Sequence, residues 1–116
     1  MDKFNKKVSH LQQTIKEICA DELTQLQEQG GIVVDSRTLS EYQAGHIENS
    51  IHIGRDYLEM RIEKITTDES TALIVVCQAG VRSLFAAESL INLGYKNVFS
   101  LAGGINAWQQ CYPLIK

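Results

Sequence analysis

A chain of 116 residues is long enough to bury the core of one domain and too short for two. Its apolar fraction of 44% and charged fraction of 22% are ordinary for a globular protein, and no apolar run approaches the roughly 20 residues of a membrane span. A formal net charge of −3 argues against a protein that binds nucleic acid or an anionic membrane, because both favour a basic surface.

The sequence predicts strands and helices that alternate along the chain. Residues 1–11 form a polar arm, either helical or disordered, and residues 12–116 form the predicted domain. In chain order we predict a short strand over Thr14–Ile18, a helix over about Ala20–Gln29, a strand over Ile32–Val34, a helix around Ser40–Ala44, a short strand near Ile51–Ile53, a helix over about Asp56–Ile65, a strand over Ala72–Val76, a helix over Ser83–Leu93, a strand over Asn97–Ser100 and a helix that begins near Gly103. This alternation predicts an α/β fold with a mostly parallel central sheet of about five strands.

Two of the predicted strands are short apolar runs without alternation, which is typical of a parallel sheet covered on both faces. Asp35-Ser36-Arg37 directly follows the run Ile32–Val34, and Cys77 directly follows the run Ala72–Val76. Ligands bind to such sheets beyond the carboxyl ends of the strands. We therefore expect these polar residues and Cys77 to share one edge of the sheet, where the chemistry should lie.

The amino-terminal segment and the cysteines bear on the cellular compartment. The first seven residues carry charge and no apolar run follows them, so they do not resemble a secretory signal, and we expect a cytoplasmic protein. Three cysteines at wide spacing, Cys19, Cys77 and Cys111, predict free thiols instead of a disulfide framework. The cysteines and histidines form no ligand pairs at zinc-finger spacing, so we expect no metal site and no cofactor.

The segment 77–83, Cys-Gln-Ala-Gly-Val-Arg-Ser, joins a predicted buried strand to a predicted helix. Such a loop can direct successive backbone N–H groups at one point, and the helix adds the positive end of its dipole. Gly80 allows a backbone angle that other residues resist, and Arg82 brings a permanent cation. This surrounding favours the thiolate of Cys77, which is the nucleophilic form. The alternative is an inert cysteine that ends a core strand, but the Cys-x-x-Gly-x-Arg spacing before a helix favours function.

Four motifs of the sequence, in this order, resemble those of the rhodanese-like sulfurtransferases. They are Asp35-Ser36-Arg37 for Asp-x-Arg, residues 41–47 (Glu-Tyr-Gln-Ala-Gly-His-Ile) for Glu-Tyr/Phe-x-x-Gly-His-Ile, residues 77–83 for the catalytic loop, and residues 101–108 (Leu-Ala-Gly-Gly-Ile-Asn-Ala-Trp) for Leu-x-Gly-Gly-x-x-x-Trp. Each motif alone is weak, whereas four in the right order over roughly residues 14–110 are specific. The sequence departs from the family pattern at Ser36, where an apolar residue is common, and at Glu48-Asn49-Ser50.

The resemblance implies a three-layer α/β/α rhodanese-like domain that transfers a sulfane sulfur from thiosulfate or a persulfide donor. The thiolate of Cys77 would accept the sulfur and hold it as a persulfide, and Arg82 would help to bind an anionic donor. The loop residues that would surround the persulfide are Gln78, Ala79, Gly80, Val81, Arg82 and Ser83. The acceptor would be cyanide in an assay and a thiol or sulfur-carrier protein in the cell. The segment 51–61 gives a weaker resemblance to modules that serve sulfur carriers or their activating enzymes.

Outside the loop, three residues are expected to support the site. The resemblance implies that Asp35 and Arg37 brace its edge, although they could simply pair with each other or with helix ends. His46 follows a glycine at a predicted helix end, so we expect it to satisfy local backbone groups more than to act as a general base. Cys19 and Cys111 are expected to be bystanders.

Two other classes of function remain open. Cysteine-dependent phosphatases and arsenate reductases of the related fold also place a Cys-to-Arg loop before a helix. The phosphatase loop has five residues between the two, however, and this loop has four. A non-catalytic rhodanese-like binding module often lacks the cysteine, and this chain keeps Cys77. The sequence therefore favours a sulfurtransferase.

Overall fold

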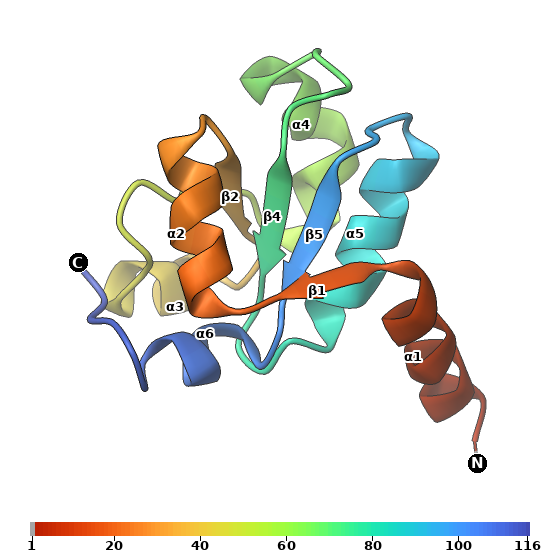
Figure 1. Ribbon diagram of the computed structural model, residues 1–116, viewed down its shortest axis with the longest axis horizontal. Helices are drawn as coiled ribbons and strands as arrows, with labels where there is room; N and C mark the ends of the chain where they lie inside the picture. Colours follow the sequence, from red (N-terminus) through yellow and green to blue (C-terminus); the bar gives the residue numbers. More distant parts are fainter. Residues whose placement is uncertain (1) are drawn as a thin grey trace.

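The computed structural model describes residues 2–116, which form a five-stranded parallel sheet with helices on both faces (Figure 1). The strands are β1 (Lys16–Ile18), β2 (Ile32–Asp35), β3 (Ile51–His52), β4 (Leu73–Val76) and β5 (Val98–Leu101), and their order in the sheet is β1-β5-β4-β2-β3. The helices are α1 (Lys3–Thr14), α2 (Ala20–Glu28), α3 (Leu39–Ala44), the 3-10 helix η1 (Arg55–Tyr57), α4 (Leu58–Ile65), α5 (Arg82–Asn92) and α6 (Gly104–Trp108). The predicted α/β fold with five parallel strands is confirmed.

Two hydrophobic clusters, one on each face of the sheet, hold the helices in place. Side chains of α1, α4 and α5 pack against one face, and side chains of α2 and α6 pack against the other. Leu73 and Val75 of β4 face the first cluster, and Ile74 and Val76 face the second. All four side chains are buried, because successive residues of a strand point to opposite faces and both faces are covered here. This explains why β4 is a continuous apolar run in the sequence.

The amino-terminal arm, which the sequence left as either helical or disordered, is helical from Lys3 onward. The carboxylate of Asp2 caps it by accepting from the N–H of Asn5 at 2.7 Å. Leu11 is fully buried in the cluster that contains α5, and Phe4 stacks on Phe85 of α5 at 5.5 Å between ring centroids. The segment therefore packs on the body of the fold.

The remaining elements lie within one or two residues of their predicted bounds. The strand predicted over Thr14–Ile18 begins only at Lys16, because α1 extends through Thr14 and the N–H of Ile15 still donates to the Leu11 carbonyl at 2.7 Å. Within residues 2–116 no helix is both long and apolar enough to cross a membrane.

Candidate active site

The polar ends of β2 and β4 meet at one edge of the sheet, as predicted. The two strands are neighbours, and Asp35 lies opposite Val76 in their register. The backbone N–H of Ser36 donates to the Val76 carbonyl at 3.0 Å, and its hydroxyl donates to the same oxygen at 2.9 Å. The second bond accounts for the departure from the family pattern at Ser36, because a small buried hydroxyl finds an acceptor there. Cys77 follows Val76 directly and so lies beside this turn.

Cys77 is almost wholly buried, with 5% of its surface exposed, and the loop that follows it closes around the sulfur. Among residues 2–116, the backbone N–H groups that donate to Cys77 Sγ are those of Gly80 at 3.2 Å and Ser83 at 3.3 Å. The Ser83 hydroxyl lies 3.4 Å from the same sulfur. Three polar groups therefore surround one sulfur atom, and each can donate a hydrogen to it when it is negatively charged.

Gly103 and Gly104 of the last motif allow α6 to pack closely against the cysteine loop. The N–H groups of Ile105 and Asn106, in the first turn of α6, donate to the carbonyls of Cys77 and Gln78 at 2.9 and 3.0 Å. Gly104 makes this approach possible, since a Cβ on Gly104 would lie 2.7 Å from the Gln78 carbonyl oxygen. Gly80 adopts a φ of +87°, in the left-handed region that favours glycine.

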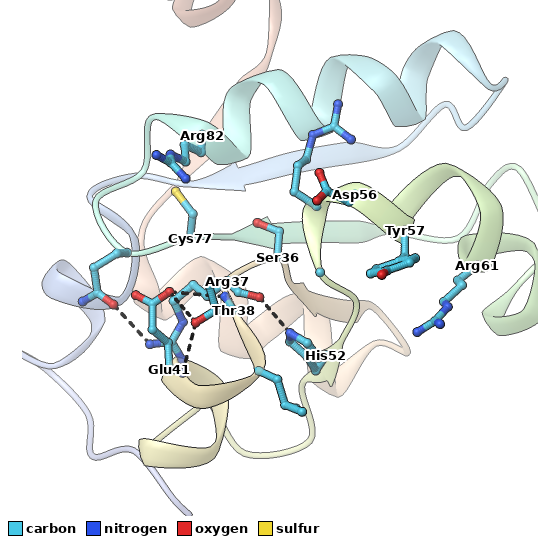
Figure 2. A pocket seen from close by; sticks show the side chains of 14 residues that line it. Ser36, Arg37, Thr38, Glu41, His52, Asp56, Tyr57, Arg61, Cys77 and Arg82 are labelled. Atoms are coloured by element: carbon cyan, nitrogen blue, oxygen red, sulfur yellow. Dashed lines mark hydrogen bonds between the residues drawn. The ribbon is translucent and has the colours of Figure 1, made fainter.

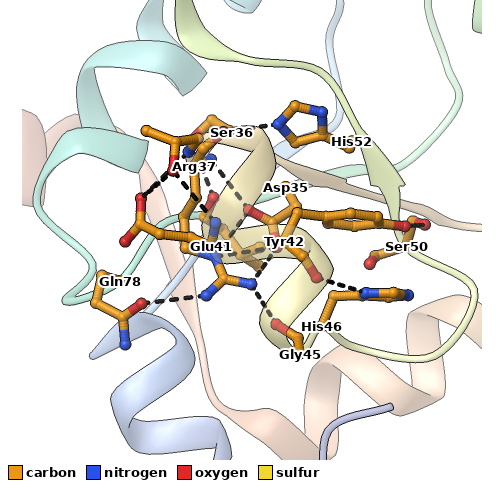
Figure 3. Close-up of polar contacts among 12 residues, drawn as sticks. Asp35, Ser36, Arg37, Glu41, Tyr42, Gly45, His46, Ser50, His52 and Gln78 are labelled. Atoms are coloured by element: carbon orange, nitrogen blue, oxygen red, sulfur yellow. Dashed lines mark hydrogen bonds and ion pairs between the residues drawn. The ribbon is translucent and has the colours of Figure 1, made fainter. Parts of the chain in front are cut away.

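Asp35 and Arg37 form a buried ion pair that connects three segments around the loop (Figure 3). The Arg37 guanidinium donates to the Asp35 carboxylate through Nε and Nη2, with the shortest distance 2.9 Å. The same guanidinium donates to the Gly45 carbonyl at 2.7 Å and to Gln78 Oε1 at 3.2 Å. Gln78 in turn donates from its amide to Asn106 Oδ1 at 2.6 Å. The pair thus ties the end of β2 to the end of α3, the cysteine loop and α6.

His46 lies apart from the cysteine loop. Its Nδ1 bonds the Tyr42 carbonyl at 2.8 Å, and its ring stacks on the Tyr42 ring at 3.8 Å between centroids. Its backbone pairs with that of Ile115 through two hydrogen bonds of 2.8 and 2.9 Å. The structure therefore does not bring His46 to Cys77, and its Nδ1 and its backbone groups have local partners.

A groove of about 860 Å³ opens in front of Cys77 (Figure 2). One wall comes from the start of α3, with Thr38 and Glu41, and the other comes from residues 52–61. Figure 2 shows Cys77 and Arg82 at one end of the groove and Tyr57 and Arg61 at the other. The predicted site residues include none from this second wall, because nothing in the local sequence pattern places residues 52–61 beside Cys77.

The groove carries several charged side chains. Arg82 and Arg61 are exposed, and the Arg61 guanidinium lies over the Tyr57 ring at 4.5 Å from its centroid. The Thr38 hydroxyl donates to the Glu41 carboxylate and is the largest cause that holds the pKa of Glu41 below its usual value. The backbone N–H of Thr38 donates to the same carboxylate, and the positive charges of Arg37 and Arg82 lower this pKa further. Glu41 therefore presents an anionic carboxylate to the groove at neutral pH.

The other two cysteines lie outside this site. Cys19 and Cys111 are exposed free thiols, and neither lines the groove. In the part of the chain that the structure describes, no group of three or more His, Cys, Asp or Glu side chains is placed to hold a metal ion.

The chain is similar in sequence to a known family and to named relatives. The family model of the rhodanese-like domain matches residues 19–111. The chain is also 35% identical over 98 residues to the thiosulfate sulfurtransferase GlpE of Pseudomonas savastanoi pv. phaseolicola, a match that covers 84% of this chain and 91% of that protein. The chain belongs to the rhodanese-like family.

Solved structures have the same fold. A thiosulfate sulfurtransferase from Pseudomonas aeruginosa matches with a TM-score of 0.80 and 26% identity, over 89% of this chain and 20% of that chain. A Rhodopseudomonas palustris protein described as a possible tyrosine phosphatase matches with a TM-score of 0.84 over 100% of this chain and 96% of that chain, and its 23% identity shows the fold alone. The predicted three-layer rhodanese fold is confirmed, and the protein is a sulfurtransferase of the rhodanese type.

The buried pair of Asp35 and Arg37 should affect stability when one partner is removed. Arg37→Ala should lower the free energy of unfolding by about 3–5 kcal/mol, because it leaves the fully buried Asp35 carboxylate without its partner. Arg55→Ala is the matched control, since it removes an arginine whose pair with Glu59 is exposed, and it should change stability by less than about 1 kcal/mol. Urea unfolding of both variants measures the difference. Equal losses would show that the buried pair has no special weight.

Proposed function

We propose that this sulfurtransferase carries a sulfane sulfur on Cys77, as a persulfide, from thiosulfate or a persulfide donor to a thiophilic acceptor. The observation that carries the proposal is the position of Cys77 Sγ, which receives the N–H groups of Gly80 and Ser83 at 3.2 and 3.3 Å. Such donors favour an anionic sulfur, and the thiolate is the nucleophile. The relatives that are named thiosulfate sulfurtransferases support thiosulfate as one donor.

The reaction balances in two steps. The Cys77 thiolate attacks the sulfane sulfur of thiosulfate, a new S–S bond forms, and the S–S bond of thiosulfate breaks as sulfite leaves with the electron pair. A second nucleophile, cyanide or a thiolate, then attacks the outer sulfur, and the Cys77 thiolate leaves. Each step moves one sulfur atom and one electron pair, so the cycle requires neither an oxidant nor a cofactor.

The first two peptide groups of the loop are suited to hold the outer sulfur. The carbonyls of Cys77 and Gln78 are bonded to the first turn of α6. Because a trans peptide places its C=O and N–H on opposite sides, the N–H groups of Gln78 and Ala79 point away from α6. We assign these two N–H groups to the outer sulfur of the persulfide and those of Gly80 and Ser83 to the inner sulfur.

The groove supports a partner larger than thiosulfate or cyanide. Its volume of about 860 Å³ lies within the range of about 300–1,000 Å³ for sites that enclose a drug-sized molecule, whereas thiosulfate is a much smaller ion. The end of the groove opposite Cys77 carries the Arg61 cation stacked on Tyr57. These features suit a thiol whose body or carrier segment bears a carboxylate, and we propose such a thiol as the acceptor in the cell.

Cys77 should be the residue that carries the sulfur. Incubation with thiosulfate should add one sulfur atom to the protein, and cyanide should remove it, as followed by intact-mass spectrometry. Cys77→Ser should abolish both the adduct and thiocyanate production, because no other thiol lies in the loop. The double variant Cys19→Ser/Cys111→Ser is the control and should keep turnover within a few-fold. Turnover by the Cys77→Ser protein would contradict the assignment.

Arg82 should attract an anionic sulfur donor through its positive charge. Arg82→Ala should raise the KM for the thiosulfate dianion by about tenfold at low salt, and less at high salt, since screening weakens an interaction with an exposed charge. A persulfide donor of low charge should be affected less. Lys64→Ala, which removes an exposed cation of α4 outside the groove, serves as the control for net charge. An equal effect on both donors would make Arg82 a brace of the loop.

The length of the loop should exclude phosphatase chemistry. Four residues between Cys77 and Arg82 enclose a smaller space than five, and a persulfide needs room for one sulfur whereas a phosphoryl group brings its equatorial oxygens. We expect no measurable hydrolysis of aryl phosphates, even at high protein concentration. Steady aryl phosphatase activity that disappears in Cys77→Ser would overturn the proposed function.

A further inference from the structure

All four arginines of the chain line the groove in front of Cys77, whereas the other seven basic residues, all lysines, do not. Two of these arginines form ion pairs with carboxylates of the chain. The other two, Arg61 and Arg82, are exposed and form no ion pair with a carboxylate of residues 2–116. Arginine is enriched and lysine depleted at the centre of protein interfaces, and a guanidinium binds a carboxylate through two parallel hydrogen bonds. The groove therefore favours an anionic partner, on a protein whose formal net charge is −3.

Arg61 is held in place before any ligand binds. Its guanidinium lies over the Tyr57 ring at 4.5 Å from the centroid, in a cation–π contact that limits its rotamers. A guanidinium that is already oriented loses less conformational entropy when it binds a carboxylate. Figure 2 shows Arg82 at the Cys77 end of the groove and Arg61 at the opposite end. Arg82 is therefore placed for the sulfur donor, and Arg61 is the cation left for the acceptor.

The distance along the groove constrains the length of the acceptor. Strands β4, β2 and β3 are neighbours, and Val76, Asp35 and His52 lie opposite one another in their registers. With about 4.8 Å between neighbouring strands, the backbone of His52 lies about 10 Å from that of Val76, the residue before Cys77. Figure 2 shows Arg61 farther from Cys77 than His52 is. The carboxylate of a free cysteine molecule is attached beside its own thiol group and cannot span this distance, whereas three residues of extended chain cover about 10 Å.

Each wall of the groove also exposes an apolar side chain. Leu39, at the start of α3, is 55% exposed, and Tyr57, on the opposite wall, is 48% exposed. A small ionic thiol covers little of this surface, whereas a peptide that lies along the groove removes it from water. The walls therefore suit a peptide better than a small thiol.

We propose that the acceptor is a cysteine within an extended, acidic protein segment that lies along this groove, and that Arg61 binds a carboxylate about three residues from that cysteine. The inference rests on the proposed function and deepens it, because it names the class of acceptor for the persulfide on Cys77. Arg61 determines which acceptor is used and does not touch the reacting sulfur atoms.

Transfer to such a segment balances without a further reagent. The acceptor cysteine gives up its proton to solvent, and its thiolate attacks the outer sulfur of the persulfide. A new S–S bond forms on the acceptor, the S–S bond to Cys77 breaks, and Cys77 leaves as a thiolate with the electron pair. The acceptor segment departs as a persulfide.

Three peptides, blocked at both ends, test the length and the charge. The first, Glu-Gly-Gly-Cys-Gly-Gly-Glu, carries a carboxylate three residues from the cysteine in either chain direction. The second has glutamine in place of both glutamates, and the third, Gly-Gly-Glu-Cys-Glu-Gly-Gly, has the same composition as the first with both acids beside the cysteine. With thiosulfate as the donor, mass spectrometry of the peptide persulfide gives kcat/KM for each peptide. The unmodified protein should use the first peptide about fivefold better than the other two, as expected of one partly exposed ion pair.

Variants of Arg61 test whether this residue makes the distinction. Arg61→Ala should use the first and second peptides equally, and comparison of the same peptides between proteins cancels differences in the intrinsic reactivity of their thiols. Arg61→Glu should prefer a peptide with lysine in place of both glutamates, because the two charges are then exchanged. Lys64→Ala is the matched control, since it removes a cation of the same helix outside the groove, and it should keep the preference for the first peptide.

The outcomes separate this inference from the proposed function. Equal use of the three peptides by a protein that converts thiosulfate and cyanide to thiocyanate would overturn the inference and leave the proposed function in place. A preference that persists in Arg61→Ala, or that is as strong for the third peptide as for the first, would also overturn the inference. If the unmodified protein produces no thiocyanate, the proposed function and the inference are both wrong.

Discussion

The site depends on one constraint, the attachment of the first two peptide groups of the cysteine loop to α6. The carbonyls of Cys77 and Gln78 are bonded to the N–H groups of Ile105 and Asn106, so neither carbonyl can turn toward the sulfur. A carbonyl oxygen beside a thiolate would repel it, whereas an N–H group attracts it. Gly104 permits the contact because no side chain separates α6 from the loop. The electrostatic character of the cradle therefore follows from backbone packing and does not require a charged side chain at the sulfur.

The Asp35–Arg37 pair maintains this arrangement from the opposite side. Its guanidinium bonds the side chain of Gln78, whose amide bonds Asn106, so the loop is held between β2 and α6. An ion pair buried in this way contributes more to a defined geometry than to net stability, since desolvation offsets much of the attraction. Arg37 is thus occupied by structural contacts, and Arg82 and Arg61 remain exposed in the groove.

Much of this arrangement was predictable because it depends on local patterns. The continuous apolar run of β4 predicts a strand buried on both faces, and the carboxyl ends of parallel strands meet at one edge, so the sequence alone predicts that Asp35 and Cys77 lie close together. Helix α1 was only partly predictable. Its apolar residues Phe4, Val8 and Leu11 have helical spacing, but a polar segment of this length folds only if it finds a surface, and that surface on α5 lies far along the chain.

The groove wall could not be predicted from the sequence, for a physical reason. Residues 52–61 contain ordinary charged and aromatic side chains, and only the course of the chain after β3 carries them to the front of Cys77. The position of this wall depends on contacts between segments that are distant in sequence. The fold holds the surroundings of the Cys77 sulfur more tightly than it holds the groove. The sulfur is surrounded by backbone N–H groups and a buried hydroxyl, whereas exposed side chains such as Tyr57 and Arg61 line the groove. Exchange of an exposed side chain usually changes stability little, whereas a change in the buried cradle disturbs packing and hydrogen bonds at once. A substitution in the groove should therefore cost less stability than one in the cradle around Cys77.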